Sequence, residues 1–264
     1  MRAPVQKKEW FERWFGEEYK ALYPHRDEAQ AEDQVGAVLR ALADAAGTAD
    51  VLRPWRVLDV GCGTGRHLRA FRKLGQAGPS RLNAFGVDLS AVLIRDARST
   101  GLNVARADMR RLPFRDGAFD LVTCFFTSFG YFATIEEDAA VLAEFRRLAR
   151  PSGFLFLDLP NAGPLAGNLV PSEVVELAGR HVEVERRLEG DSVVKRLRIL
   201  CQDKNENRDD EYFEERVRLF PPERLEPLLR GLDLETVKIF GDEHGSDFNP
   251  QRSPRMSLLL RCPG

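Results

Sequence analysis

Residues 57–65 read Val57-Leu58-Asp59-Val60-Gly61-Cys62-Gly63-Thr64-Gly65. A short apolar run ends in Asp59, three glycines then alternate with small residues, and residues 66–71 begin a helical pattern. This order predicts a strand, a tight turn and a helix. Glycine suits such a turn because it adopts dihedral angles that other residues avoid and lets a ligand approach the bare backbone. The stretch therefore predicts a ligand-binding turn in an α/β fold.

Two common glycine-rich motifs do not match this turn. In the dinucleotide motif G-x-G-x-x-G the third glycine comes one residue later than Gly65 does, and the Gly-Lys-Ser/Thr ending of a phosphate loop is missing. The acid-x-Gly-x-Gly-x-Gly pattern instead resembles the first motif of class I S-adenosylmethionine-dependent methyltransferases. This resemblance implies that Asp59, Gly61, Cys62, Gly63 and Gly65 hold the methionine end of that cofactor.

Composition sets the limits of the interpretation. The 264 residues, 43% of them hydrophobic and 30% charged, suit one large α/β domain or one domain with an insertion. A net charge of −2 gives no indication of nucleic-acid binding. Four cysteines, at positions 62, 124, 201 and 262, and four histidines are scattered without metal spacing, so we expect reduced thiols and no metal site. No leader or spanning segment is evident, which predicts a cytoplasmic protein that does not bind a membrane.

Aromatic residues between Trp10 and Tyr23 recur at helical spacing. Such a stripe can belong to a helix packed on the core or to a lid over the cofactor, and both readings stay open. Residues 19–26 resemble the N-terminal segment of small-molecule methyltransferases, which implies that Tyr19 and Tyr23 approach the methionine end of the cofactor. A second helix is expected over residues 27–46, ending at Gly47.

A second strand, residues 83–88, ends in an acid 23 residues after Gly65. An acid about 20 residues beyond the glycine turn, at the end of the next strand, binds the ribose of a nucleotide. Asp88 can also help to begin a helix that Ser90 caps, and the two roles are compatible. We therefore expect Asp88 to bind the ribose, with Leu89 beside it.

The next strand, residues 103–106, leads to Asp108 and Met109. This pair resembles the adenine-binding motif of the methyltransferases, although it could also be a surface turn. The resemblance implies that Asp108 accepts a hydrogen bond from the exocyclic amine and that the backbone of Met109 meets a ring nitrogen. A fourth strand ends at residue 124, and Phe125 is expected to complete the cofactor site.

The aromatic loop over residues 125–132 leaves the fourth strand at its carboxyl end, where ligands bind in open α/β sheets. It lacks the Asn/Asp-Pro-Pro-aromatic motif by which nucleic-acid amino-methyltransferases resemble one another, which argues against methylation of a base. The loop could contact a small acceptor or cover the adenine. Tyr131 is a candidate catalytic residue within it.

Beyond a helix over residues 135–149 and a fifth strand over 154–159, the α/β alternation is interrupted. Three alternating runs between residues 182 and 220 predict an antiparallel meander. It resembles the cap of small-molecule methyltransferases, including sugar N-methyltransferases, although a dimer surface is the alternative. Asp158, at the end of the fifth strand, and His244, in a polar loop between the two final strands, are further candidates for catalysis. Asp158 could instead cap a loop, and His244 could simply lie in a solvated hairpin loop.

The resemblance as a whole implies a Rossmann-like class I methyltransferase sheet of seven strands with the last pair reversed. We expect a helical arm (1–50), a cofactor-binding core (51–161), an antiparallel β cap (162–220) and a C-terminal completion of the sheet (221–264). The expected function is S-adenosylmethionine-dependent methyl transfer, by in-line displacement, to an N or O atom of a small molecule. The alternatives are an RNA or protein methyltransferase, a nicotinamide-dependent oxidoreductase, or a methyltransferase fold that serves as a binding or regulatory module. The protein could form a homodimer.

Overall fold

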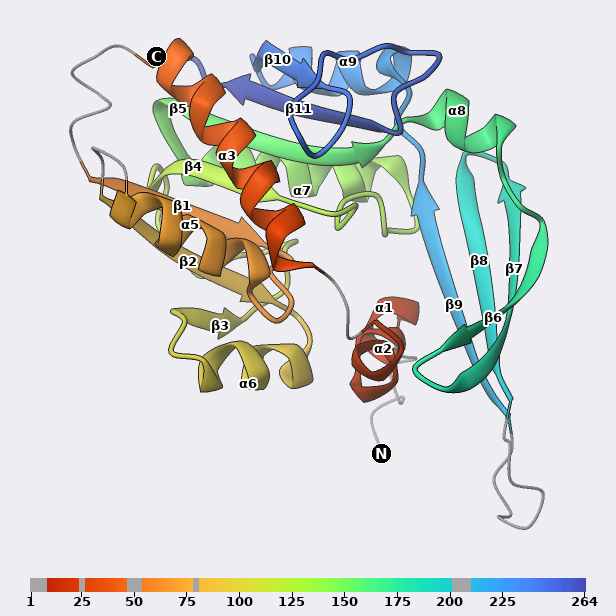
Figure 1. Cartoon of the computed structure of the whole chain (residues 1–264). Helices are drawn as coiled ribbons and strands as arrows, with labels where there is room; N and C mark the ends of the chain where they lie inside the picture. Colours follow the sequence, from red (N-terminus) through yellow and green to blue (C-terminus); the bar gives the residue numbers. More distant parts are fainter. Residues whose placement is uncertain (1–8, 24–26, 47–53, 78–80, 201–209) are drawn as a thin grey trace, which may run out of the picture.

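The computed structural model describes residues 9–23, 27–46, 54–77, 81–200 and 210–264. Gly47, where the second helix was expected to end, and Cys201 lie outside these residues. A seven-stranded sheet has the order β10-β11-β5-β4-β1-β2-β3 (Figure 1). Its strands are β1 (Trp55–Val60), β2 (Leu82–Asp88), β3 (Val104–Arg106), β4 (Phe119–Cys124), β5 (Ala149–Pro160), β10 (Glu235–Phe240) and β11 (Arg255–Arg261).

The first five strands of this sheet are parallel, and β11 runs antiparallel to both β5 and β10. The predicted sheet with a reversed last pair is therefore present. Strand β4 is buried along its whole length because helices cover both faces of the sheet. The parallel arrangement brings the carboxyl ends of β1, β2 and β4 to one edge, where the predicted cofactor residues follow the strands.

Helices α3 (Glu28–Ala45) and α5 (Arg66–Ala77) cover one face of the sheet, and α7 (Ile135–Leu148) and α9 (Pro222–Gly231) cover the other (Figure 1). Asp27 caps α3 by accepting a hydrogen bond from the amide of Ala29, so the helix expected over 27–46 is confirmed to within one residue. Helix α6 (Ala91–Ser99) packs beside α5 through Ile94, Ala97 and Leu68.

A second, four-stranded antiparallel sheet follows β5 and the short helix α8 (Ala162–Gly167) (Figure 1). Its strands, in spatial order, are β6 (Ser172–Leu177), β7 (Arg180–Glu189), β8 (Ser192–Ile199) and β9 (Glu211–Arg218). We call this sheet the cap. The sequence predicted three of its strands and missed β6, because β6 is an edge strand whose residues are all at least partly exposed, Val174 to 67%, and which therefore lacks a buried apolar face.

The aromatic N-terminal stretch forms two short helices, α1 (Trp10–Trp14) and α2 (Glu17–Leu22), and not one continuous helix. The chain breaks at Phe15 and Gly16, where helical geometry is lost. Trp14 and Leu22 are fully buried against the cap strands, whereas Phe11 packs into the core of the seven-stranded sheet. The arm therefore joins the cap to the core.

Strand β5 begins earlier than expected, at Ala149 and not at residue 154. Ala149 already pairs with Phe119 of β4, and the pairing then shifts in register before it resumes at Phe154. Ser152 absorbs this irregularity with a φ of 56°. Residues 151–153, whose Pro-Ser-Gly sequence is typical of the end of a helix, thus belong to the distorted start of the strand.

A buried ion pair fastens the cap to the core. Arg218, at the end of β9, is only 8% exposed and binds Asp138 of α7, while its Nε lies 2.9 Å from Asp191 of the β7–β8 turn. Burial raises the pKa of the fully buried Asp138 to about 6, although the Arg218 charge opposes this rise.

Candidate functional site

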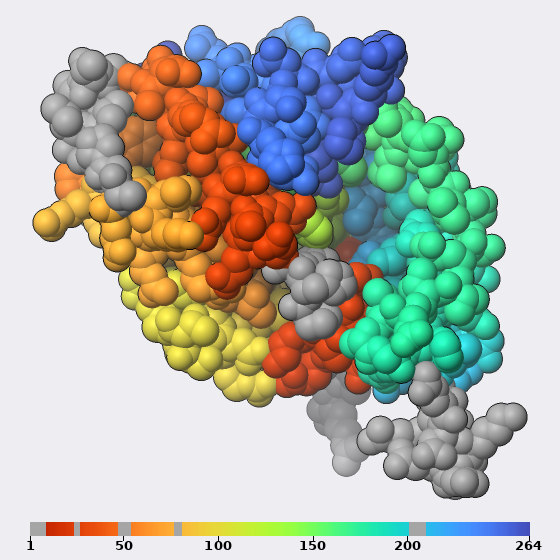
Figure 2. Space-filling view, in the orientation of Figure 1, coloured from red at the N-terminus to blue at the C-terminus, as the bar shows by residue number. Residues whose placement is uncertain are grey.

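One cavity of about 880 Å³ lies where the sheet edge, the N-terminal arm and the cap meet. The surface is hollowed between the core and the cap (Figure 2). Eleven of the fifteen residues predicted for the site line this cavity: Tyr19, Tyr23, Gly61, Cys62, Gly63, Asp88, Leu89, Asp108, Met109, Phe125 and Tyr131. Asp59, Gly65, Asp158 and His244 are not among its lining residues.

The glycine turn after β1 has the backbone geometry that only glycine adopts easily. Gly61, Gly63 and Gly65 have φ angles of 72°, 55° and 83°. A Cβ atom on Gly61 would lie 2.7 Å from the Cβ of Ser128, and one on Gly65 would lie 2.3 Å from Leu102. Gly61 therefore keeps the backbone of the cavity bare, whereas Gly65 allows the helix that follows to pack closely.

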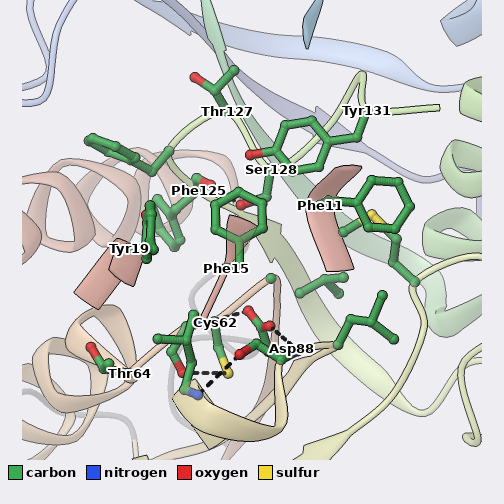
Figure 3. Close-up of a pocket in the computed structure, with 18 of the residues that line it drawn as sticks. Phe11, Phe15, Tyr19, Cys62, Thr64, Asp88, Phe125, Thr127, Ser128 and Tyr131 are labelled. Carbon is green, nitrogen blue, oxygen red and sulfur yellow. Dashed lines mark hydrogen bonds between the residues drawn. The ribbon is translucent and has the colours of Figure 1, made fainter. Parts of the chain in front are cut away.

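Asp88 ends β2 inside the cavity (Figure 3). Its Oδ2 accepts a hydrogen bond from the amide of Gly63 at 2.9 Å, and its Oδ1 accepts one from the amide of Ser90 at 2.8 Å. Burial raises the pKa of this carboxyl, and these backbone amides oppose the rise. Ser90 in turn caps α6 by accepting from Leu93, so the helix-capping reading holds for Ser90. A carboxylate offers about four lone-pair positions, so Asp88 keeps room for both hydroxyls of a ribose.

Asp108 lines the cavity in the loop after β3, but it is paired with a residue that the sequence analysis did not single out. Both of its carboxylate oxygens accept from the guanidinium of Arg110, at 2.6 to 3.1 Å. Burial opposes ionisation of Asp108, but the hydrogen bonds from Arg110 outweigh it and lower the pKa of the carboxyl. A ligand that binds Asp108 therefore shares the carboxylate with Arg110.

Asp59 lies at the end of β1, beneath the turn, and is 1% exposed. Burial raises its pKa to about 7, against the hydrogen bond from Thr123 and the charge of Arg66. Its Oδ1 accepts from Thr123 at 3.0 Å, whereas its Oδ2 has no hydrogen-bond partner among the described residues. The structure thus places Asp59 behind the lining of the cavity, where it binds Thr123 of the neighbouring strand β4.

Aromatic side chains form the wall opposite Asp88 (Figure 3). The ring of Phe15 lies 4.8 Å from that of Tyr19 and 5.8 Å from that of Tyr131, and Trp10 lies 4.8 Å from Tyr131. We call Trp10, Phe15, Tyr19 and Tyr131 the aromatic wall. Some rings of the N-terminal stripe are thus buried in the packing, and others line the cavity. A lid over the cofactor stays a prediction.

Asp158 is 2% exposed and is occupied by interactions within the protein. Its Oδ1 accepts from Arg255 at 2.9 Å and from Ser257 at 2.7 Å, and its Oδ2 accepts from Gln34 at 2.9 Å and from the amide of Phe126 at 2.8 Å. Burial opposes ionisation, but these partners, Arg255 above all, lower the pKa of Asp158. The carboxylate organises the loop after β4 and does not face the cavity.

His244 lies on the surface, where its Nδ1 is 3.1 Å from Oδ2 of Asp33 and its side chain is 64% exposed. His244 is therefore a solvated loop residue, which was the alternative to a catalytic role. Of the three candidate catalytic residues, Tyr131 alone lines the cavity.

The cap brings two charged side chains to the cavity that the sequence analysis did not single out. Lys195 of β8 and Glu215 of β9 line it and are directly paired across the two strands. The signal in the sequence is a charge within each of two alternating apolar runs, but the strand register is needed to bring the two together. Within the described residues, no cluster of histidine, cysteine and acidic side chains could hold a metal ion.

The residues present fit a nucleoside cofactor. The bare backbone of the turn, the carboxylate at the end of β2 and the volume of the cavity together suit a ligand with a ribose. The strand order, with its antiparallel β11 next to β5, and the acid-x-Gly-x-Gly-x-Gly turn define the class I methyltransferase architecture.

Comparison with known proteins agrees with this class. Residues 57–153 match a family described as a methyltransferase domain. The ubiquinone/menaquinone biosynthesis C-methyltransferase UbiE of Cupriavidus metallidurans is 40% identical over 104 residues, which are 37% of this chain and 40% of that protein. The aligned part is thus less than half the length of this relative.

Solved structures match nearly the whole chain. An S-adenosylmethionine-dependent methyltransferase from Clostridium acetobutylicum gives a TM-score of 0.73 at 19% identity, covering 93% of this chain and 96% of that one. The sugar N-methyltransferase KedS8 from a Streptoalloteichus species gives 0.67 at 23% identity, covering 100% and 98%. Residues 57–153 are thus similar to a methyltransferase domain, and nearly the whole chain shares the fold of these solved structures. The predicted fold class is confirmed.

Proposed function

We propose that this protein transfers a methyl group from S-adenosylmethionine to an N or O atom of a small molecule. The observation that carries the proposal is the cavity that joins the glycine turn and Asp88, on one side, to the cap residues Lys195 and Val217 on the other. Its volume of about 880 Å³ leaves space for an acceptor beside the cofactor.

The cofactor assignments follow the order of the strands. We assign the ribose to Asp88, and the adenine to Leu89, Asp108 and Met109. The methionine end is assigned to the turn over residues 61–63 and to Tyr19, Tyr23 and Phe125, and Asp59 and Gly65 support that turn from behind. When bound, S-adenosylmethionine supplies a methyl group that is already activated, so the protein's main tasks are alignment and the exclusion of water.

The aromatic wall and the cap serve these two tasks. The rings of Phe15, Tyr19 and Tyr131 stand against one another and present an apolar surface to the cavity. Tyr131 carries a hydroxyl on this wall and remains the candidate that could exchange a proton with the acceptor.

Methylation of a nucleic acid and nicotinamide-dependent oxidation are less well supported by the cavity and the sequence. A cavity roofed by the cap suits a small molecule better than a nucleic acid, and the net charge of −2 gives no attraction for phosphates. A nicotinamide-dependent oxidoreductase would require the dinucleotide spacing G-x-G-x-x-G, which residues 61–65 do not have. The relative UbiE is named as a C-methyltransferase, so carbon acceptors belong in any screen.

The test uses S-adenosylmethionine with a labelled methyl group and a cell extract separated by size into small molecules, RNA and protein. We expect label in the small-molecule fraction with the wild-type protein and not with Asp88→Ala. Label that appears mainly in RNA or protein would instead support those alternatives. Label in none of the fractions would leave the fold as a binding module.

A further inference from the structure

The inner face of the cap carries a charged pair within an apolar strip. Strands β8 and β9 pair Val193 with Val217, Lys195 with Glu215, and Leu197 with Phe213. The first two of these pairs line the cavity, and the third packs against the N-terminal arm. Because charges on an apolar face cost free energy unless they are partnered, the contacts of this pair indicate what it is suited to bind.

Glu215 has spare hydrogen-bonding capacity. Its Oε1 accepts from the indole of Trp14, and its Oε2 lies 3.5 Å from Nζ of Lys195, which itself donates to the hydroxyl of Tyr23 at 2.8 Å. A close ion pair has its heavy atoms about 2.8 Å apart, so Lys195 and Glu215 are only loosely coupled. Of about four lone-pair positions on the carboxylate, these two contacts occupy two.

The rings of the aromatic wall and of Tyr23 line the same cavity as this carboxylate. The ring of Tyr23 lies 5.4 Å from that of Tyr19, which lies 4.8 Å from Phe15, and Phe15 in turn contacts Tyr131. Aromatic faces attract cations, most strongly where water is excluded. Lys195 already lies over the Tyr23 ring, with its Nζ 5.4 Å from the centroid, whereas Glu215 is joined to the rings through Trp14, whose ring lies 5.5 Å from that of Tyr19. The remaining ring faces and the Glu215 carboxylate are therefore complementary to a second positively charged group.

We propose that Glu215 binds the amino group of the methyl acceptor, and hence that the acceptor is an amine. This inference rests on the proposed function and narrows its N or O acceptor to nitrogen. The apolar part of the amine packs against Val193 and Val217. Lys195 and the hydroxyl of Tyr23 lie beside the amino group, where they can contact a neighbouring polar substituent.

The cap offers a matched control. The next cross-strand pair along β8 and β9 is Arg196 with Glu214, and Arg196 Nε donates to Glu214 at 2.9 Å. Because side chains alternate along a strand, this pair lies on the opposite face, and neither residue lines the cavity. Glu214→Gln therefore changes the same charge in the same two strands without changing the cavity.

The experiment titrates the protein, with and without S-adenosylhomocysteine, with benzylamine, benzyl alcohol and benzoate in a calorimeter. We expect benzylamine to bind about tenfold or more tightly than benzyl alcohol, as a hydrogen bond to a charged group implies. Glu215→Gln should abolish this preference and Glu214→Gln should preserve it. Lys195→Met should strengthen benzylamine binding, because it removes a like charge, and this second variant decides the matter if Glu215→Gln does not fold.

The failures of the two proposals are distinct. If S-adenosylhomocysteine does not bind the wild type, the proposed function fails, and the titrations without it still decide the role of Glu215. If S-adenosylhomocysteine binds but the wild type shows no preference for benzylamine, or binds none of the probes, the inference about Glu215 is wrong and the methyltransferase proposal stands. Preference for benzoate that Lys195→Met removes would also overturn it and would indicate an anionic acceptor.

Discussion

The carboxylate of Asp158 accepts the amide hydrogen of Phe126 at 2.8 Å and so holds the loop after β4 in a strained form. Phe126 and Thr127 have φ angles of 55° and 61°, a region that residues other than glycine seldom adopt, least of all a β-branched one. Thr127 donates its amide hydrogen to the carbonyl of Asp158 and accepts from Arg255. Phe126, Thr127 and Ser128 line the cavity, so Asp158 shapes the site without facing it.

We expect Asp158→Asn to lower the free energy of unfolding by about 3 kcal/mol, because it leaves Arg255 without its buried charge partner. Urea denaturation measures the change. Glu226→Gln is the control, since Glu226 and Arg230 form an exposed pair and should lose no more than about 0.5 kcal/mol. Equal effects of the two substitutions would contradict the account of the loop.

The glycine turn allows a matched comparison of two substitutions. Gly61 and Gly101 have nearly the same φ, 72° and 73°, but a Cβ atom at Gly61 meets Ser128 at 2.7 Å whereas one at Gly101 meets nothing within 4 Å. We expect both alanine variants to lose about 1 kcal/mol of stability from backbone strain. Only Gly61→Ala should also lose affinity for S-adenosylhomocysteine. We expect a loss of roughly tenfold or more, because the added methyl group displaces the ligand from the backbone of the turn. Calorimetry on both variants checks this, and similar affinities would show that the turn does not hold the cofactor.

Asp59 should make the protein less stable as the pH rises from about 4 to 7. Its folded pKa of about 7 exceeds the ordinary value of 3.8, so over this range the folded state binds more protons than the unfolded state. The penalty is complete above pH 7 and amounts to at most about 4 kcal/mol. Asp59→Asn keeps the hydrogen bond from Thr123 possible and removes the titration.

The measurement compares the free energy of unfolding of wild type and Asp59→Asn between pH 4 and 8. The difference should grow in favour of the variant up to pH 7 and then stay constant. Asp138, whose pKa is raised to about 6, titrates in both proteins and so cancels in the difference. A difference that does not change with pH would contradict the buried, partly unpartnered state of Asp59.

The pair that fastens the cap to the core makes a further prediction. Arg218→Met leaves the buried Asp138 without its charged partner, and we expect a loss of about 3–5 kcal/mol in the free energy of unfolding. Adding Asp138→Leu should recover most of it, since an apolar pair can replace a buried ion pair at little cost. A double-mutant cycle in urea measures the coupling. If the two losses simply add, the two residues do not act together.

Much of the core was predictable from the sequence because its signals are local. The turn over residues 57–65, the acid at Asp88 and the capping serine all lie within a few residues of the structure they produce. The two candidate catalytic residues that do not line the cavity, Asp158 and His244, were inferred only from their position at a strand end or in a polar loop. Their partners Gln34, Arg255 and Asp33 are far away in the sequence.

The acceptor side was less predictable for a related reason. The pairing of Lys195 with Glu215 depends on the register between β8 and β9, and their approach to Asp88 depends on how the cap docks on the core. Neither follows from periodicity. The break between α1 and α2, at Phe15 and Gly16, likewise follows from packing against both sheets.

The most direct test of the account is the binding of S-adenosylmethionine, S-adenosylhomocysteine and NAD to the purified protein and to Asp88→Ala, measured by calorimetry. The account predicts that both adenosyl ligands bind the wild type, that NAD does not, and that Asp88→Ala loses both while still unfolding cooperatively. Binding of NAD alone, or adenosyl affinities that Asp88→Ala leaves unchanged, would contradict it.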